Sequence, residues 1–421
     1  MARAPHRRGS AGARPAGVLR NGTFRWFAAG SLGTSLATWL VRIVQDVEAY
    51  DATGGATSVG MVSALQFGPP LLLTFLGGRL ADGRLARRAL LISPILLVTV
   101  CLGLIVADAT VGLGIEVIAV SALLLGGTTA IDLPLRQTVI ADVVDRRHIP
   151  AAVSVGSASM QIGRLIGPAL GGLLVSVSGP PAALWCGLCC VSLTLMSALV
   201  VGPRMRPVTG KPGEKPRYGA LRYAWGDHTI RFMLVLAGVV GIFAYNFAVI
   251  FLTLGADLSA DGARAYGFLN MAIAVGSILG AVLTVRLPQV PVGVALWGSG
   301  LGLALSAAAL APTLAICLVC AFVTGACSIG FAVGTTTVLQ RHATREFRGR
   351  VIAMQSLLMV GTTPIGSPLI GALIDRGGAQ MTVFLVGLAC AGLALLTLAI
   401  MRPRAGRGDG DNGDRAAETR P

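Results

Sequence analysis

The feature that most constrains this chain is a series of continuous apolar runs, each about 20 residues long. At about 1.5 Å per residue, such a run crosses the ~30 Å hydrocarbon core of a bilayer as one helix. Backbone groups in that core have no water to bond, so a spanning segment is a helix or part of a closed barrel. Barrel strands alternate in polarity, and these runs do not. We therefore predict an all-α membrane protein.

The composition agrees with this class. Apolar residues make up 54% of the 421 residues and charged residues only 13%, with a mean hydropathy of +0.75. A soluble domain carries about 25% charged residues. The net charge of +15 would suggest a nucleic-acid partner in a soluble protein. Here the basic residues gather between apolar runs, so we expect the lipid bilayer and no nucleic acid as a partner.

Charged or Pro/Gly-rich breaks divide the chain into twelve candidate spans. They cover residues 24–47, 57–79, 89–108, 114–139, 152–176, 182–201, 231–254, 264–285, 293–311, 313–338, 351–373 and 380–401. Lys and Arg favour the cytoplasmic side of a membrane. With the N-terminus inside, only Arg264 and Arg376 lie in outside loops, and Arg42, Arg136 and Arg164 lie within spans. This pattern predicts a multi-pass protein of the inner or plasma membrane with both termini in the cytoplasm.

The longest basic stretch, Pro203 to Arg231, separates two halves of six spans each. We expect a basic tail (1–23), an N-terminal six-helix bundle (24–201), a cytoplasmic linker (202–230), a C-terminal six-helix bundle (231–401) and a cytoplasmic tail (402–421). The basic start lacks the apolar core of a signal peptide. Within the linker, Tyr218 to Trp225 is typical of a short amphipathic helix on the membrane surface.

The two halves repeat one pattern: the fifth span of each follows a basic loop and carries a Gly and Pro cluster. The first half has Gly167 and Pro168, and the second has Gly366 and Pro368 after Arg348-Gly349-Arg350. Such repeats are common in secondary transporters, whose substrate site lies between them near the midplane.

The loop between the second and third spans, Gly77 to Arg88, combines glycines with Asp82 and several arginines. An ion pair here could break and reform as two halves move, because Asp82 accepts charge-assisted bonds from arginine. The alternative is a positive-inside anchor without a gating role. This loop resembles the signature cytoplasmic motif of the major facilitator superfamily, although Gly83, Leu85 and Ala86 depart from it. The matching residues are Gly78, Leu80, Asp82, Arg87 and Arg88.

The fifth span is similar to the antiporter motif of the same superfamily, except that Ser154 replaces its upstream glycine. The matching residues are Gly163, Gly167, Pro168, Gly171 and Gly172. Small residues permit close helix contact, and proline removes a backbone donor. General helix packing is the alternative explanation. The resemblance implies a fold of two pseudo-symmetric six-helix bundles, a gating role for these residues and for Arg348, Gly349 and Arg350, and export rather than uptake.

Further matches resemble the enterobactin-exporter-like branch, whose members export siderophores or drugs. They are Arg42, Gln45, Asp46, Gln66, Phe67, Asp132, Pro134, Arg136, Gln137, Ser157 to Ser159, Arg164, Tyr245, Asn246 and Phe247.

Charged residues inside spans are the candidates for energy coupling, because each costs about 2.5–3.5 kcal/mol or more at a span centre without a partner or a water-filled cavity. Arg42 and Asp46, and likewise Asp132 and Arg136, are four residues apart and share a helix face. Either aspartate could exchange protons against substrate, with its arginine as partner. Alternatively, each pair is a static neutral link between helices.

Polar or aromatic residues within spans are candidate substrate contacts, although interhelical hydrogen bonds are a frequent alternative. We take as candidates Gln45, Gln66, Gln137, Gln161, Arg164, Asn246 and Phe247; Gln355, Trp39, Phe67 and Phe243 could also line a cavity.

The cysteine pairs and the search for catalytic motifs give no evidence of metal, redox or catalytic chemistry. Cys186 and Cys189, like Cys317 and Cys320, lie in apolar spans without acidic or histidine neighbours and are expected to pack as small hydrophobes. The sequence contains no Gly-x-x-x-x-Gly-Lys-Ser/Thr phosphate loop and no familiar catalytic motif.

We therefore predict a proton-coupled exporter of small amphipathic molecules, without cofactor or metal, acting as a monomer and not as an enzyme. An importer, a uniporter and a non-transporting membrane sensor are the alternatives.

Overall fold

The computed structural model describes residues 21–80, 84–144, 148–204, 219–344 and 346–401, and within these ranges it is helical, with no strand. The helices before the linker are α2 (Gly22–Thr53), α3 (Ala56–Leu80), α4 (Arg84–Thr110), α5 (Ile115–Val143), α6 (Ile149–Ser178) and α7 (Pro180–Val201), followed by the short η2 (Gly202–Arg204). Those after it are α8 (Ala220–Gly226), α9 (His228–Phe243), α10 (Phe247–Leu258), α11 (Gly262–Arg286), α12 (Pro291–Ala309), α13 (Leu314–His342), α14 (Arg348–Val360), α15 (Thr363–Gly377) and α16 (Ala379–Met401).

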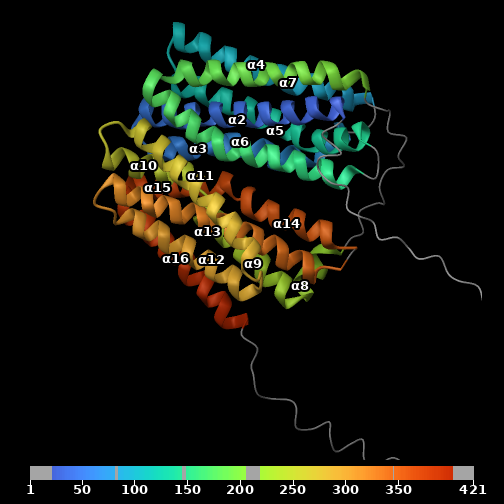
Figure 1. Cartoon of the computed structure of the whole chain (residues 1–421). Helices are drawn as coiled ribbons and strands as arrows, with labels where there is room; N and C mark the ends of the chain where they lie inside the picture. Colours follow the sequence, from blue (N-terminus) through green and yellow to red (C-terminus); the bar gives the residue numbers. More distant parts are fainter. Residues whose placement is uncertain (1–20, 81–83, 145–147, 205–218, 345, 402–421) are drawn as a thin grey trace, which may run out of the picture.

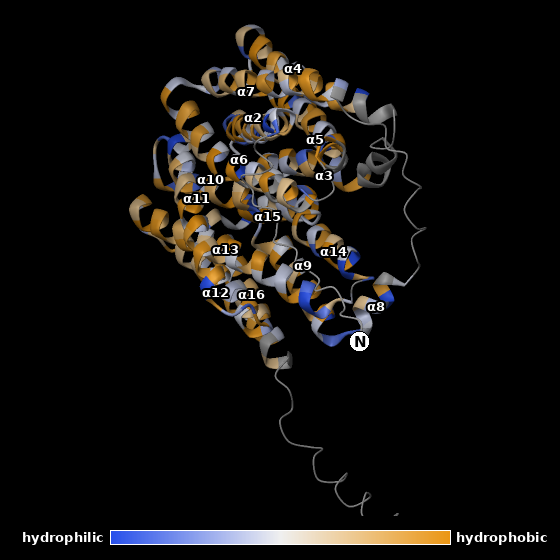
Figure 2. Ribbon diagram, turned by 45° about the vertical axis from the view of Figure 1, so that its right-hand side comes forward, coloured by the Kyte–Doolittle hydropathy of each residue, from blue (hydrophilic) through white to orange (hydrophobic). Residues whose placement is uncertain are grey.

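Eleven helical segments in the described part are long and apolar enough to cross a membrane. They coincide with eleven of the twelve predicted spans. The remaining prediction, 57–79, falls on α3, a helix of 25 residues whose side chains are described only as far as Leu72. Apolar residues occupy most of the length of the helices (Figure 2), and many large apolar side chains are exposed, with Val285 at 87%. Such a surface is suited to lipid.

The helices form two bundles, with α2 to α7 in one and α9 to α16 in the other (Figure 1). Within the first bundle, α2 packs against α6 and α7. Within the second, α11 packs against α13, and α12 against α16. The bundles meet chiefly where α3 packs along α15 and α6 along α11.

The closest backbone approaches between the bundles lie at one end of the molecule, which we call the closed end. A β-carbon on Gly60 of α3 would collide with the backbone of Ser367 in α15, and one on Gly172 of α6 would collide with the backbone of Gly267 in α11. Only glycine permits this contact, because any side chain would force the helices apart. In Figure 1 the bundles diverge toward the opposite end, where α8 lies.

Two spans of the second bundle are broken in the middle. The seventh consists of α9 and α10, joined at Ala244 to Asn246, and the eleventh of α14 and α15, joined at Gly361 and Thr362. By contrast, α2, α5 and α6 are continuous helices of 29 to 32 residues, although α6 contains Pro168.

The predicted helix in the linker is present as α8. Tyr223 stacks on Phe347 with ring centroids 4.4 Å apart, and its hydroxyl accepts a hydrogen bond from the Thr344 backbone at 3.0 Å. On the same helix, Leu221 and Trp225 are 63% and 53% exposed. An anchored helix with exposed apolar residues one turn apart fits a position against a membrane surface.

Candidate transport cavity

A cavity of about 830 Å³ lies between the two bundles. Its walls include side chains from α2 to α6 on one side and from α10, α11, α13, α14 and α15 on the other. This volume is in the range of small-molecule sites. Among the described residues, five charged side chains line it, and all belong to the first bundle: Arg42, Asp46, Asp132, Arg136 and Arg164.

Arg42 is held by aromatic rings. Its guanidinium carbon lies 4.2 Å from the centroid of Phe67 and 4.9 Å from that of Trp39, and the residue is only 5% exposed. Its Nε atom has no hydrogen-bond partner within the described part of the chain. Arg42 and Asp46 both face the cavity, as the four-residue spacing predicts, but no ion pair joins them there.

Asp46 belongs to a network of amides instead. Its Oδ1 accepts a hydrogen bond from Gln66 Nε2 at 3.3 Å, and Gln66 Nε2 also donates to Gln45 Oε1 at 3.0 Å. Gln45 in turn donates to Ser121 of α5 at 2.8 Å. The Tyr266 hydroxyl of α11 reaches the other carboxylate oxygen of Asp46 at 3.4 Å. This last bond connects the two bundles through a buried carboxylate.

Asp132 and Arg136 form the ion pair that their spacing predicts, through Asp132 Oδ2 and Arg136 Nε. Both are half-buried on α5, and Arg136 Nη1 is buried without a hydrogen-bond partner in the part of the chain described.

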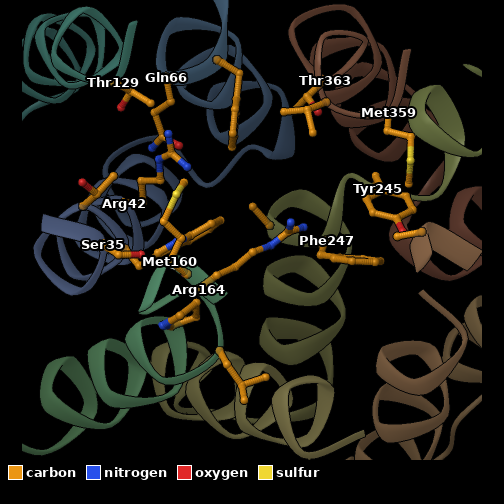
Figure 3. A pocket seen from close by; sticks show the side chains of 18 of the residues that line it. Ser35, Arg42, Gln66, Thr129, Met160, Arg164, Tyr245, Phe247, Met359 and Thr363 are labelled. Carbon is orange, nitrogen blue, oxygen red and sulfur yellow. Dashed lines mark hydrogen bonds between the residues drawn. The ribbon is translucent and has the colours of Figure 1, made fainter. Parts of the chain in front are cut away.

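Arg164 extends from α6 into the space between the bundles, toward Phe247 (Figure 3). Its guanidinium carbon is 6.0 Å from the Trp39 ring centroid. The side chain is exposed to the cavity, in contrast to the buried Arg42.

The glycine motif of α6 has a clear packing role. Gly163, Gly167 and Gly171, spaced by four, face α2, where added β-carbons would press on Ser35, Trp39 and Ile43. Gly172 faces the other way, toward α11. Pro168 lines the cavity itself. The motif thus lets α6 pack closely against α2 on one side and against α11 of the second bundle on the other.

The second bundle contributes uncharged groups to the cavity. The Tyr245 hydroxyl donates to the Ser328 carbonyl at 2.7 Å. Asn246, between α9 and α10, donates to the Ile242 carbonyl at 2.6 Å and accepts from the Ser367 hydroxyl at 2.7 Å. Phe247 begins α10 and faces the cavity, as Figure 3 shows.

The other predicted residues are placed as follows. Gln66, Arg164, Asn246, Phe247 and Gln355 line the cavity, whereas the fully buried Gln45 is not among the described lining residues. Arg88 is exposed near the start of α4, and Arg348, Gly349 and Arg350 form the first turn of α14. Asp82 and the side chains of Arg87, Gln137 and Gln161 lie outside the described residues, and Gly78 lies in the part of α3 whose surroundings are not described.

Sequence reasoning missed Tyr266 and Asp375. Tyr266 lies in a stretch of small and apolar residues without polar periodicity. Asp375 comes from the predicted outside end of the eleventh span, yet its two carboxylate oxygens accept from the Ala56 and Thr57 backbone amides at 2.7 and 2.9 Å. It therefore caps α3 from the other bundle.

Membrane-length helices in two bundles, with a cavity between them that carries charged side chains, define a multi-pass membrane transporter. The chain belongs to the transmembrane secretion effector family of the major facilitator superfamily. The model of this family matches residues 13–418.

Curated relatives are transporters as well, so the chain is a transporter and not an enzyme. The multidrug efflux pump Tap of Mycolicibacterium fortuitum is 26% identical over 83% of this chain and 88% of its own length. The staphyloferrin A transporter of Staphylococcus aureus is 30% identical over 47% of this chain and 49% of its own. The enterobactin exporter EntS of Salmonella choleraesuis is 27% identical over 60% and 62%.

Solved structures share the fold. A POT family transporter in complex with 5-aminolevulinic acid has a TM-score of 0.69 at 12% identity, covering 90% of this chain and 95% of that one. The nucleoside transporter NupG has a TM-score of 0.68 at 15% identity, covering 90% and 99%. The predicted major facilitator fold is confirmed.

Proposed function

We propose that this protein is a secondary exporter of small amphipathic molecules, driven by proton antiport with alternating access. The observation that carries the proposal is a cavity shared by two bundles, with the buried carboxylate of Asp46 bonded to both of them. Its relatives are named as efflux pumps or siderophore transporters, which supports export.

Alternating access requires two bundles that can separate at one end while they close at the other. The glycine contacts and the Asp375 cap join the bundles at the closed end. With both termini in the cytoplasm, as we predict from the basic residues, this end faces outward. The structure then corresponds to a state that receives substrate from the cytoplasm, as an exporter needs.

Proton coupling requires a group whose charge state changes the contact between the bundles. Ionised Asp46 accepts hydrogen bonds from Gln66 and from Tyr266 of the other bundle. Protonation removes the negative charge and weakens the bond to Tyr266, which favours separation of the bundles at the closed end. Asp132 remains a second candidate. Its partner Arg136 lies on the same helix, so a change in the charge of Asp132 would alter a contact within α5 and not a contact between the bundles.

The test is substrate-dependent proton movement in everted membrane vesicles, followed with a pH-sensitive dye and a panel of drugs and siderophores. We expect at least one compound to collapse the proton gradient, and we expect Asp46→Asn to abolish that response. Asp257→Asn, at an exposed acid that does not line the described cavity, is the matched control. Full coupling in both Asp46→Asn and Asp132→Asn would refute the proton-carrier role.

A further inference from the structure

Two arginines in the cavity, Arg42 and Arg164, form no ion pair with an acidic side chain that the structure describes. Within the described part of the chain, neither Arg42 nor Arg164 makes an ion pair or a hydrogen bond, and both contact aromatic rings. Their guanidinium carbons lie 4.9 and 6.0 Å from the centroid of the same Trp39 ring. Two cationic groups therefore stand beside one aromatic surface.

The remaining charges of the cavity neutralise these two arginines only in part. Asp132 is bound to Arg136. Asp46 is one turn from Arg42 and offsets part of its charge, but its oxygens accept from Gln66 and Tyr266 and make no ion pair with the guanidinium. Three cations and two anions line the described cavity, so an excess of positive charge remains beside Trp39.

An unpaired guanidinium in a membrane protein is retained where it meets water or an anionic ligand. Arginine stays protonated and presents its donors as a planar fork that matches a carboxylate or another oxyanion. The two heads differ in a useful way: Arg42 is buried and fixed between Trp39 and Phe67, whereas Arg164 is exposed and reaches toward Phe247 (Figure 3).

The geometry points to a binding site for an amphipathic anion, whose carboxylate or similar oxyanion lies between Arg42 and Arg164 beside Trp39. The apolar part of the ligand extends toward Phe247 and the uncharged wall of the second bundle. This inference rests on the proposed function and names the substrate class of the same cavity. A cationic amphipath of similar size is disfavoured, since it would meet the excess of positive charge beside Trp39.

The test is equilibrium binding to the full-length protein in lipid nanodiscs, measured by fluorescence polarisation with empty nanodiscs as blank. Carboxyfluorescein is the anionic probe, unlabelled aromatic carboxylates are competitors, and rhodamine 6G is the cationic probe. The variants are Arg164→Gln, Arg42→Gln and the conservative Arg164→Lys. Arg264→Gln, at an exposed arginine that does not line the described cavity, is the matched control.

We expect the anionic probe to bind the natural protein more tightly than the cationic one. Arg164→Gln should weaken anion binding about tenfold, as expected for the loss of a charge-assisted hydrogen bond. Arg164→Lys should retain part of the affinity, and Arg264→Gln all of it. Because Arg164 is exposed, its variants keep the inference testable even if Arg42→Gln fails to fold.

Two results would overturn the inference: tighter binding of the cationic probe, or anion affinity unchanged in Arg164→Gln and in folded Arg42→Gln. Failure of the natural protein to bind any of the carboxylates would also count against it. The binding assay uses no proton gradient, so it is independent of the vesicle assay for proton movement. Anion binding in nanodiscs without proton movement in vesicles would refute the antiport proposal alone. Proton movement in vesicles that only cationic compounds drive would refute the anion site alone.

Discussion

The two bundles share a repeated topology but differ in what they bring to the cavity. The first bundle supplies every charged side chain that lines the described cavity, on the continuous helices α2, α5 and α6. The second supplies hydroxyl, amide and aromatic groups, and two of its spans are broken, at Ala244 to Asn246 and at Gly361 and Thr362.

The physical reason for this division lies in positioning. A charged side chain in a membrane must be held next to a partner or a water-filled cavity that solvates it. A continuous helix fixes it in that position. A break in a helix frees backbone groups and allows the two segments to move separately. We infer that, in the proposed exporter, the first bundle carries the charges for substrate recognition and proton coupling, while the broken helices of the second provide the moving wall.

The strongest test of this division is Asp46→Asn. We expect the rate of proton-coupled transport to fall by about 100-fold or more, because the neutral amide cannot change charge. Gln355→Ala, which alters a polar lining residue of the second bundle, should reduce the rate only by a few-fold. Transport by both variants in everted vesicles provides the measurement, and equal losses would remove the distinction between the bundles.

A second test uses the Asp132–Arg136 pair. Asp132→Asn leaves a half-buried arginine without its carboxylate and should destabilise the protein by about 1–3 kcal/mol. The double variant Asp132→Asn, Arg136→Gln should recover part of that loss, because it removes the unpaired charge. Thermal unfolding of these two variants and of Arg136→Gln alone, in detergent, measures the coupling. Strict additivity would mean that the pair contributes nothing.

The break in the seventh span is tested by Asn246→Ala. The substitution removes the bonds to the Ile242 carbonyl and the Ser367 hydroxyl, which should cost about 1–2 kcal/mol and lower transport several-fold. Asn270→Ala is the matched control, because Asn270 also lines the cavity, on the continuous α11, and donates to the Tyr266 carbonyl one turn before it. Equal effects of the two changes on stability and rate would contradict a special role for the break.

The smallest expected effect concerns the closed end. Asp375→Asn retains the shape of the side chain but removes its charge and one of the two oxygens that accept from α3, which should weaken the cap by about 0.5–1 kcal/mol. In a cysteine-free background, a cysteine placed at Thr38 should then react about two- to fivefold faster with an impermeant external thiol reagent. Asp261→Asn, which alters a cap within one bundle, is the control. An unchanged reaction rate would show that Asp375 does not hold this end closed.

Much of the fold could be predicted from local sequence, because membrane-spanning helices satisfy their own backbone hydrogen bonds and need only length and hydropathy. The Asp132–Arg136 pair was predictable for the same reason, since four-residue spacing brings two side chains together on any helix. The glycine motif of α6 likewise indicated a close helix contact, although not that Gly163, Gly167 and Gly171 meet α2 while Gly172 meets α11.

Arg42 and Asp46 have the same spacing, yet they do not pair. Gln66 comes from α3, Tyr266 from α11, and Phe67 and Trp39 enclose the guanidinium. The partners of Asp46 are thus 20 and 220 residues away in the chain, and Asp375 is 319 residues from Ala56, the first residue of the helix that it caps. The sequence by itself determined the helices, their number to within one span and the charges they carry. Only the tertiary structure decided which charges were neutralised, because in a low-dielectric interior that outcome depends on neighbours from other helices.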